Sequence, residues 1–132
     1  MRHRRVPLAL LLLFGLFACK SEGLRVTTIQ LGSSVNADET VARSTTRFTP
    51  DETVYISIHT AGVGSGKLGV RWRLGTRVLS ERTEQVSFRD VAATEFHLQS
   101  AGGFPLGDYE VDALLNGQPV GTRSFRVEKA RN

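Results

Sequence analysis

The chain has a single cysteine, Cys19, among its 132 residues. One cysteine excludes a disulfide within a single molecule, so the fold must be held by its hydrophobic core. A chain of this length with 40% hydrophobic residues can bury such a core as one domain of ordinary size. The composition also excludes a disordered or collagen-like protein.

The chain has little net charge once its first residues are set aside. Its formal charge is +4, with 17 basic and 13 acidic residues. Without Arg2, Arg4 and Arg5, 14 basic residues remain against 13 acidic ones, which leaves a net charge of +1. Five aromatic residues of the remaining chain fall at positions that predict a core: Phe48, Trp72, Phe96, Tyr109 and Phe125. Both features argue against nucleic acid as a partner.

No apolar run in the chain is long enough to span a membrane. The longest extends from Val6 to Phe17, about a dozen residues, whereas a transmembrane helix needs roughly 20. It follows a basic stretch over residues 1–5 and precedes Ala18 and Cys19. This three-part layout is typical of a helical secretory signal peptide, which is removed from the mature protein.

The residues before Cys19 predict how this segment is cut. An ordinary secretory site has small residues at −3 and −1, but Leu16 occupies −3. Leu16-Phe17-Ala18-Cys19 resembles the lipobox of bacterial lipoproteins at three of its four positions, and Phe17 is the departure. The resemblance implies removal of residues 1–18, a diacylglycerol on the Cys19 thiol and acylation of the new amino terminus. The alternative is an ordinary secreted protein in which Cys19 is incidental.

A lipid on Cys19 would determine where the protein resides. Several acyl chains attach a protein far more firmly than one chain, which gives only marginal, reversible binding. We therefore expect an envelope protein that is anchored to membrane lipid through Cys19 and faces the periplasm, with residues 19–23 as its lipidated tether. In lipoproteins, Lys20 rather than Asp after the cysteine implies that export to the outer membrane is permitted. The choice between inner and outer membrane stays open.

From residue 24 onward, the chain shows period-two alternation instead of helical periodicity. Val54, Ile56 and Ile58 share one face of a strong strand. Strands are predicted over 24–31, 54–59, 68–74, 77–80, 86–88, 93–98, 109–115 and 120–127, with a long loop over 32–47 that contains a short edge strand near Val41. Asn116-Gly117 predicts a type I′ hairpin turn, and the opposite parity of Val120 and Phe125 predicts a bulge near Gly121.

Seven or eight short strands separated by turns predict an all-β sandwich over residues 24–132. The pattern resembles the immunoglobulin-like domain. Trp72 lies on the third strong strand, where such domains place a core tryptophan, and Tyr109 corresponds to the tyrosine of their Tyr-x-Cys motif. Ile56 or Ile58 and Val111 stand where the two cysteines would lie, so the chain is similar to disulfide-free bacterial modules. Such a resemblance does not assign a function.

A glycine-rich segment imitates a phosphate-binding motif. Gly64-Ser-Gly66-Lys-Leu-Gly69 matches G-x-G-x-x-G, but that motif works by opening a helix, and here a predicted strand follows. We therefore interpret residues 62–66 as a hairpin loop and as a weak candidate for contact with a protein partner.

Three residues suggest a metal site. If the strands pair in the immunoglobulin order, His59 and His97 lie on neighbouring strands with Glu95 on the same face. Two histidines and a carboxylate are a familiar ligand set, which makes a metal-binding or hydrolytic envelope protein the alternative function. Exposed histidines on adjacent strands more often have no ligand role.

Four charged residues suggest a protein-binding face. Arg71 and Arg73 on one strand and Glu110 and Asp112 on another are expected on the outer face of the opposite sheet, joined by Arg126 and Glu128. Cross-strand charge pairs are worth at most a fraction of a kcal/mol each and discourage edge-to-edge aggregation. The same face also has the polar character of a docking surface.

The sequence predicts no catalytic activity. Cys19 is used by the anchor and no G-x-S-x-G motif occurs, so no nucleophile is evident. We expect no cofactor other than the covalent lipid on Cys19, and a non-catalytic binding or assembly module that meets an unidentified envelope protein. A tethered domain meets such a partner at raised effective concentration. A purely structural envelope component is a further alternative.

Overall fold

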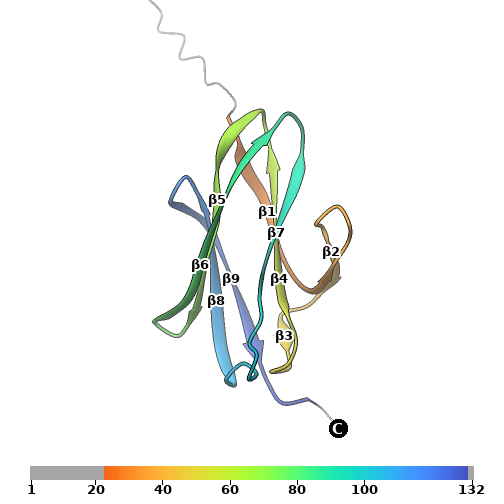
Figure 1. Ribbon diagram of the computed structural model, residues 1–132, viewed down its shortest axis with the longest axis vertical. Helices are drawn as coiled ribbons and strands as arrows, with labels where there is room; N and C mark the ends of the chain where they lie inside the picture. The colour runs from red at the N-terminus through yellow and green to blue at the C-terminus, as the bar shows by residue number, and fades with distance from the viewer. Residues whose placement is uncertain (1–22, 131–132) are drawn as a thin grey trace, which may run out of the picture.

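Nine strands in two facing sheets make up residues 23–130, the part of the chain that this computed structural model describes (Figure 1). The strands are β1 (Arg25–Val35), β2 (Val41–Ser44), β3 (Arg47–Phe48), β4 (Val54–Ala61), β5 (Gly64–Leu74), β6 (Arg77–Phe88), β7 (Ala92–Leu98), β8 (Gly107–Leu115) and β9 (Gln118–Val127). One sheet has the order β2-β1-β4-β7 and the other β3-β9-β8-β5-β6. The predicted all-β sandwich is confirmed, with nine strands where seven or eight were expected.

The predicted signal peptide, residues 1–18, and Cys19 lie outside the described residues. Among residues 23–130 there is no helix that is long and apolar enough to span a membrane.

The hydrophobic core lies between the two sheets and follows the predicted alternation. From one sheet it receives Val54, Ile56 and Ile58 of β4, all with no exposed surface. From the other it receives Leu68, Val70 and Trp72 of β5 and Tyr109, Val111 and Ala113 of β8. The ring of Phe125 stacks on Tyr109 and meets Trp72 edge-on, so three aromatic side chains from three adjacent strands pack together.

Tyr109 forms a tyrosine corner, in which its hydroxyl bonds to the backbone just before its own strand. The Tyr109 hydroxyl donates a hydrogen bond to the carbonyl oxygen of Pro105, 2.5 Å away, and the side chain is buried. Burial raises the pKa of Tyr109, so the hydroxyl remains a donor at neutral pH. The bond ties the loop before β8 to the start of that strand.

The β8–β9 hairpin has the turn and the bulge that the sequence predicts. Asn116 and Gly117 have φ values of 52° and 80°, as a type I′ turn requires. Ala113 pairs with Gly121, but Leu114 pairs with Pro119, which leaves Val120 as the extra residue of a bulge.

Strand β1 is longer than predicted. It continues through Val35, so part of the predicted loop over 32–47 is strand. Gly32 pairs with Tyr55 of β4 on one side and Ser44 of β2 on the other. Pairing on both sides holds this polar segment in the sheet, and the register shifts after Gly32. A Cβ on Gly32 would lie 2.3 Å from the Arg43 carbonyl oxygen, which explains why glycine stands at this close approach.

The two short strands predicted over 77–80 and 86–88 are the ends of one strand, β6. It pairs along its length with β5, and Arg82 lies opposite Val70 and Glu84 opposite Leu68. Cross-strand partners share a face, so these charged residues lie on the side that faces the core. Both are nevertheless exposed, because β6 is an edge strand. The sequence predicted two strands here because the charged residues Arg82 and Glu84 interrupt the alternation of apolar and polar residues that marks a strand.

Candidate functional site

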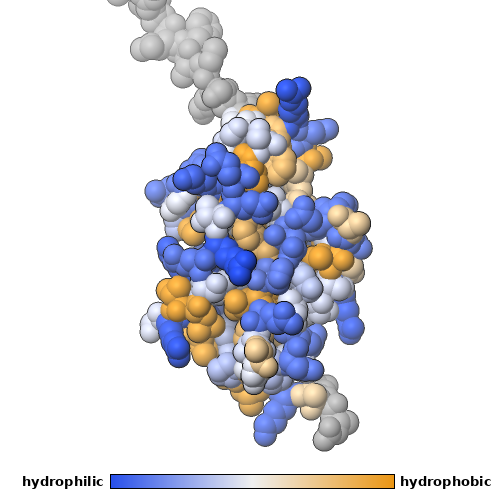
Figure 2. All heavy atoms as spheres, in the orientation of Figure 1, coloured by the Kyte–Doolittle hydropathy of each residue, from blue (hydrophilic) through white to orange (hydrophobic). Residues whose placement is uncertain are grey.

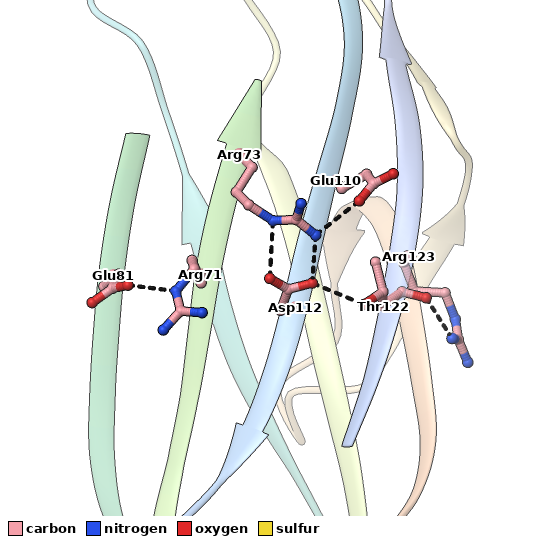
Figure 3. Close-up of polar contacts among 7 residues, drawn as sticks. All are labelled: Arg71, Arg73, Glu81, Glu110, Asp112, Thr122 and Arg123. Atoms are coloured by element: carbon pink, nitrogen blue, oxygen red, sulfur yellow. Dashed lines mark hydrogen bonds and ion pairs between the residues drawn. The ribbon is translucent and has the colours of Figure 1, made fainter. Parts of the chain in front are cut away.

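A row of charged side chains crosses the outer face of the five-stranded sheet (Figure 3). Since Val70 and Trp72 of β5 point into the core, the alternating residues Arg71 and Arg73 point outward. The β5–β8 register places Arg71 opposite Asp112 and Arg73 opposite Glu110. The four residues that the sequence suggested for this face are therefore brought together.

Arg73 holds the centre of the row. Its Nε donates to Asp112 Oδ2 at 3.0 Å and its Nη2 donates to Asp112 Oδ1 at 2.7 Å. The same Nη2 also donates to Glu110 Oε2 at 2.8 Å. A guanidinium that binds a carboxylate through two nitrogens has a fixed orientation, and the hydrogen bonds of such charged pairs are among the stronger ones in proteins. Hydrogen bonding to Asp112 raises the pKa of Arg73 above its ordinary value.

Asp112 is buried although it lies on the outer face, with an exposed fraction of 8%. Thr122 of β9 donates a further hydrogen bond to Oδ1 at 2.8 Å. Burial by itself would raise the pKa of Asp112, but the hydrogen bonds from Arg73 and Thr122 and the positive charges of Arg73 and Arg71 outweigh it and lower that pKa. The carboxylate is therefore ionised at neutral pH and held by three strands.

The charged residues on either side of the Arg73–Asp112 pair remain partly exposed to solvent. The Arg71 side chain turns to Glu81 on β6 and pairs with it, so the row reaches the edge of the sheet. The side chains of Arg71, Glu81 and Glu110 are 37%, 55% and 47% exposed. These half-exposed charges remain accessible to a partner, whereas Asp112 serves the fold.

A hollow lies next to this row. Residues 46–47, 75, 108–110 and 124–126 line it. Its volume is about 440 Å³, and Arg47 of β3, Gly75, Asp108, Glu110 and Arg126 are among its lining residues. Arg126 pairs with Asp108 at 3.1 Å and Arg47 with Glu128 at 3.9 Å. The volume is within the range of ligand sites, but the hollow is open, and four of its nine lining residues are charged. A polar, solvent-accessible lining of this kind resembles the rim of a protein interface more than an apolar ligand pocket.

Like Asp108, Arg47 is a charged residue of this hollow that the sequence did not suggest. It comes from a strand of two residues that pairs in parallel with the end of β9, with Arg47 opposite Arg126. A pairing of this kind between segments far apart in the chain leaves no local signal in the sequence.

The structure does not bring the three metal-ligand candidates together. His97 Nδ1 lies 2.6 Å from Glu95 Oε1, and the two side chains share a face of β7. On the neighbouring strand β4, however, His97 is opposite Tyr55, whereas His59 is opposite Ala93. The two histidines are therefore four positions apart along β4. Within residues 23–130 no group of three or more His, Cys, Asp or Glu side chains could hold a metal ion.

The glycine-rich segment is strand rather than loop. Only residues 62 and 63 separate β4 from β5, and Gly64–Lys67 pair with β6. Asn116 also braces Lys67, because its Oδ1 accepts a hydrogen bond from the Lys67 backbone N–H at 2.9 Å. The loop predicted over residues 62–66 is therefore wrong at residues 64–66, because pairing with β6 overrides the flexibility of the glycines.

Comparison with known proteins identifies the fold and leaves the activity open. No protein-family model matches the chain, and no curated protein matches it significantly. The crystal structure of an immunoglobulin-like protein from Pseudomonas aeruginosa aligns with a TM-score of 0.58 at 11% sequence identity, over 83% of this chain and 99% of that chain. The fold is immunoglobulin-like. This immunoglobulin-like domain has no disulfide, as predicted from its single cysteine.

Proposed function

We propose that the protein is a lipid-anchored component of the bacterial envelope whose immunoglobulin-like domain binds another envelope protein without catalysis. The observation that carries the proposal is the position of the lone cysteine relative to the domain. Cys19 closes a lipobox-like motif, and only five residues separate it from Arg25, where β1 begins. A lipid there would hold a complete folded domain directly beside the membrane.

The charged row and its hollow are the surface that best fits a protein partner. They combine half-exposed charges of both signs with a concave site, on a sheet whose geometry is fixed by strand pairing. Charges of this kind determine partner choice and association rate more than raw affinity. Attachment to the same membrane as the partner would make modest affinity sufficient.

Replacing Cys19 with serine should move the protein from the membrane fraction to the soluble fraction. The serine hydroxyl cannot take the thioether-linked lipid, so the variant would lack the acyl chains that give stable attachment. Ultracentrifugation of lysed cells with detection of a C-terminal tag measures the shift, and labelled fatty acid should be incorporated by the wild type but not by Cys19→Ser. Ser21→Ala, two positions away, is the control and should stay in the pellet. A Cys19→Ser variant that remains fully in the pellet would contradict the proposed anchor.

A photo-crosslinking amino acid at Ser124, an exposed residue that lines the hollow, should capture a discrete protein partner in intact cells. The same probe at Gln85, exposed on β6, should not capture it. Adding Glu110→Arg to the Ser124 probe should abolish the product, because it reverses a half-exposed charge beside the hollow. Equal capture from both probe positions would show that the charged row is not the docking surface.

A further inference from the structure

We propose that the end of the sandwich at which β1 begins rests on the membrane surface, with Val63 and Val91 inserted among the lipid headgroups. This inference depends on the proposed anchor at Cys19, since the anchor is what brings that end to the membrane. It assigns a lipid contact to two turns for which the fold provides no other role.

The first observation is the position of the exposed apolar side chains. Five large hydrophobic residues of the described chain are prominently exposed, and the two most exposed are Val91 at 74% and Val63 at 62%. Val63 lies in the β4–β5 turn and Val91 between β6 and β7. Exposed apolar residues scattered singly need no explanation, but two on neighbouring turn tips form a candidate contact surface.

The second observation is that both turns lie at the end of the molecule where the chain enters the domain (Figure 1). Arg25 at the start of β1 pairs with Ala61 at the end of β4, and Thr60 pairs with Ala92 at the start of β7. A Cβ on Gly64 would lie 3.5 Å from the Leu24 backbone nitrogen, so the entering chain passes directly beside the β4–β5 turn. An anchor attached just before β1 therefore approaches from this end.

The third observation is the charge around the two valines. Arg25 and Arg89 are exposed at this end, and Asp90 caps its own turn by accepting a hydrogen bond from the Val91 backbone N–H. Figure 2 shows hydrophobic and strongly hydrophilic residues side by side here. Arginine can keep its charge among headgroup phosphates while neighbouring apolar side chains enter the interface.

The length of the connection makes the contact feasible. Five residues join Cys19 to Arg25, and a connection of this length spans at most about 20 Å when fully extended. The headgroup layer on each side of a bilayer is itself about 5–7 Å thick. Two valines alone would bind a membrane too weakly to matter, but a tether makes the contact intramolecular and raises its effective concentration.

Brominated-lipid quenching tests the contact. The mature chain, residues 19–132, is coupled through its Cys19 thiol to a maleimide lipid in vesicles of phosphatidylcholine and phosphatidylglycerol with brominated acyl chains. Both probe variants also carry Trp72→Phe, because the native Trp72 would otherwise contribute to the emission. Tryptophan introduced by Val91→Trp should lose more than half of its emission and shift to the blue. The matched control is Leu106→Trp, because Leu106 is also an exposed apolar residue but lies next to Gly107, the start of β8 at the opposite end. That tryptophan should keep its emission.

Two further measurements sharpen the result. Val63→Asp added to Val91→Trp should at least halve the quenching, since it places a carboxylate in the same contact. Emission of Val91→Trp that is quenched no more than that of Leu106→Trp would overturn the proposal. Chemical coupling makes this test independent of lipidation in cells. Loss of quenching with an intact pellet shift for Cys19→Ser would therefore reject the contact alone, and quenching without that shift would reject the native anchor alone.

Discussion

Replacing Trp72 with alanine should lower the free energy of unfolding by about 3–5 kcal/mol, the usual cost of removing a fully buried large aromatic side chain. Trp72 has no exposed surface and packs edge-on against Phe125 with ring centroids 6.0 Å apart. Domains of this kind are typically stable by only about 5–15 kcal/mol in total. The variant should therefore be marginally folded, and urea unfolding followed by circular dichroism would measure the loss.

Trp72→Phe is the matched control for this prediction. The indole Nε1 is buried and has no hydrogen-bond partner among residues 23–130, so phenylalanine removes volume but no hydrogen bond seen there. The loss should be less than half of that for alanine. A Trp72→Ala variant that unfolds at nearly the same urea concentration as the wild type would show that the core does not depend on this side chain.

Replacing Arg73 with methionine should also lower the free energy of unfolding, by less than Trp72→Ala does. Asp112 would keep Thr122 as a donor but lose both hydrogen bonds from the guanidinium. A buried carboxylate that lacks its charged donor costs about 1–3 kcal/mol. The control is Arg71→Met, because Arg71 pairs with the exposed Glu81 at the edge of the sheet and its loss should change stability very little.

The penalty of Arg73→Met should depend on pH. In the wild type the pKa of Asp112 is lowered below its ordinary value, so its ionised form stabilises the fold above about pH 4, and this contribution is lost as the pH falls through the lowered pKa. Without Arg73, burial would raise the pKa of Asp112, and protonation would then relieve the uncompensated charge. Urea unfolding should show a smaller difference between variant and wild type at pH 3 than at pH 7. An equal difference at both values would contradict the role of Asp112.

Local patterns were sufficient where a strand has one buried face. The alternation of Val54, Ile56 and Ile58 predicted the inward side of β4, and the parity change after Val120 predicted the β9 bulge. They were insufficient for β6, whose core-facing side carries Arg82 and Glu84 because the strand lies at an open edge. Whether a strand is central or at an edge is decided by its partners, which a local pattern does not reveal.

The candidate site was predictable as a face but not in its pairings. Alternation correctly predicted that Arg71 and Arg73 point outward. The backbone register places Arg71 directly opposite Asp112, but their side chains do not form the pair. The guanidinium of Arg73 instead reaches diagonally to Asp112, and Arg71 turns to Glu81 on β6. Which carboxylate an arginine pairs with depends on the length of its side chain and on how many carboxylates lie within its reach. The distance between His59 and His97 was also not predictable, because it depends on the register between β4 and β7.

The charges on the core-facing side of β6 have a consequence for molecules held at high density on a surface. A strand of a second copy that extended the sheet at this edge would have to cover Arg82 and Glu84, whose charges would lose their hydration without a matching partner. Sheet-to-sheet polymerisation between crowded neighbours is thereby disfavoured. The domain can be concentrated in two dimensions without offering its longest free edge as a template for fibril growth.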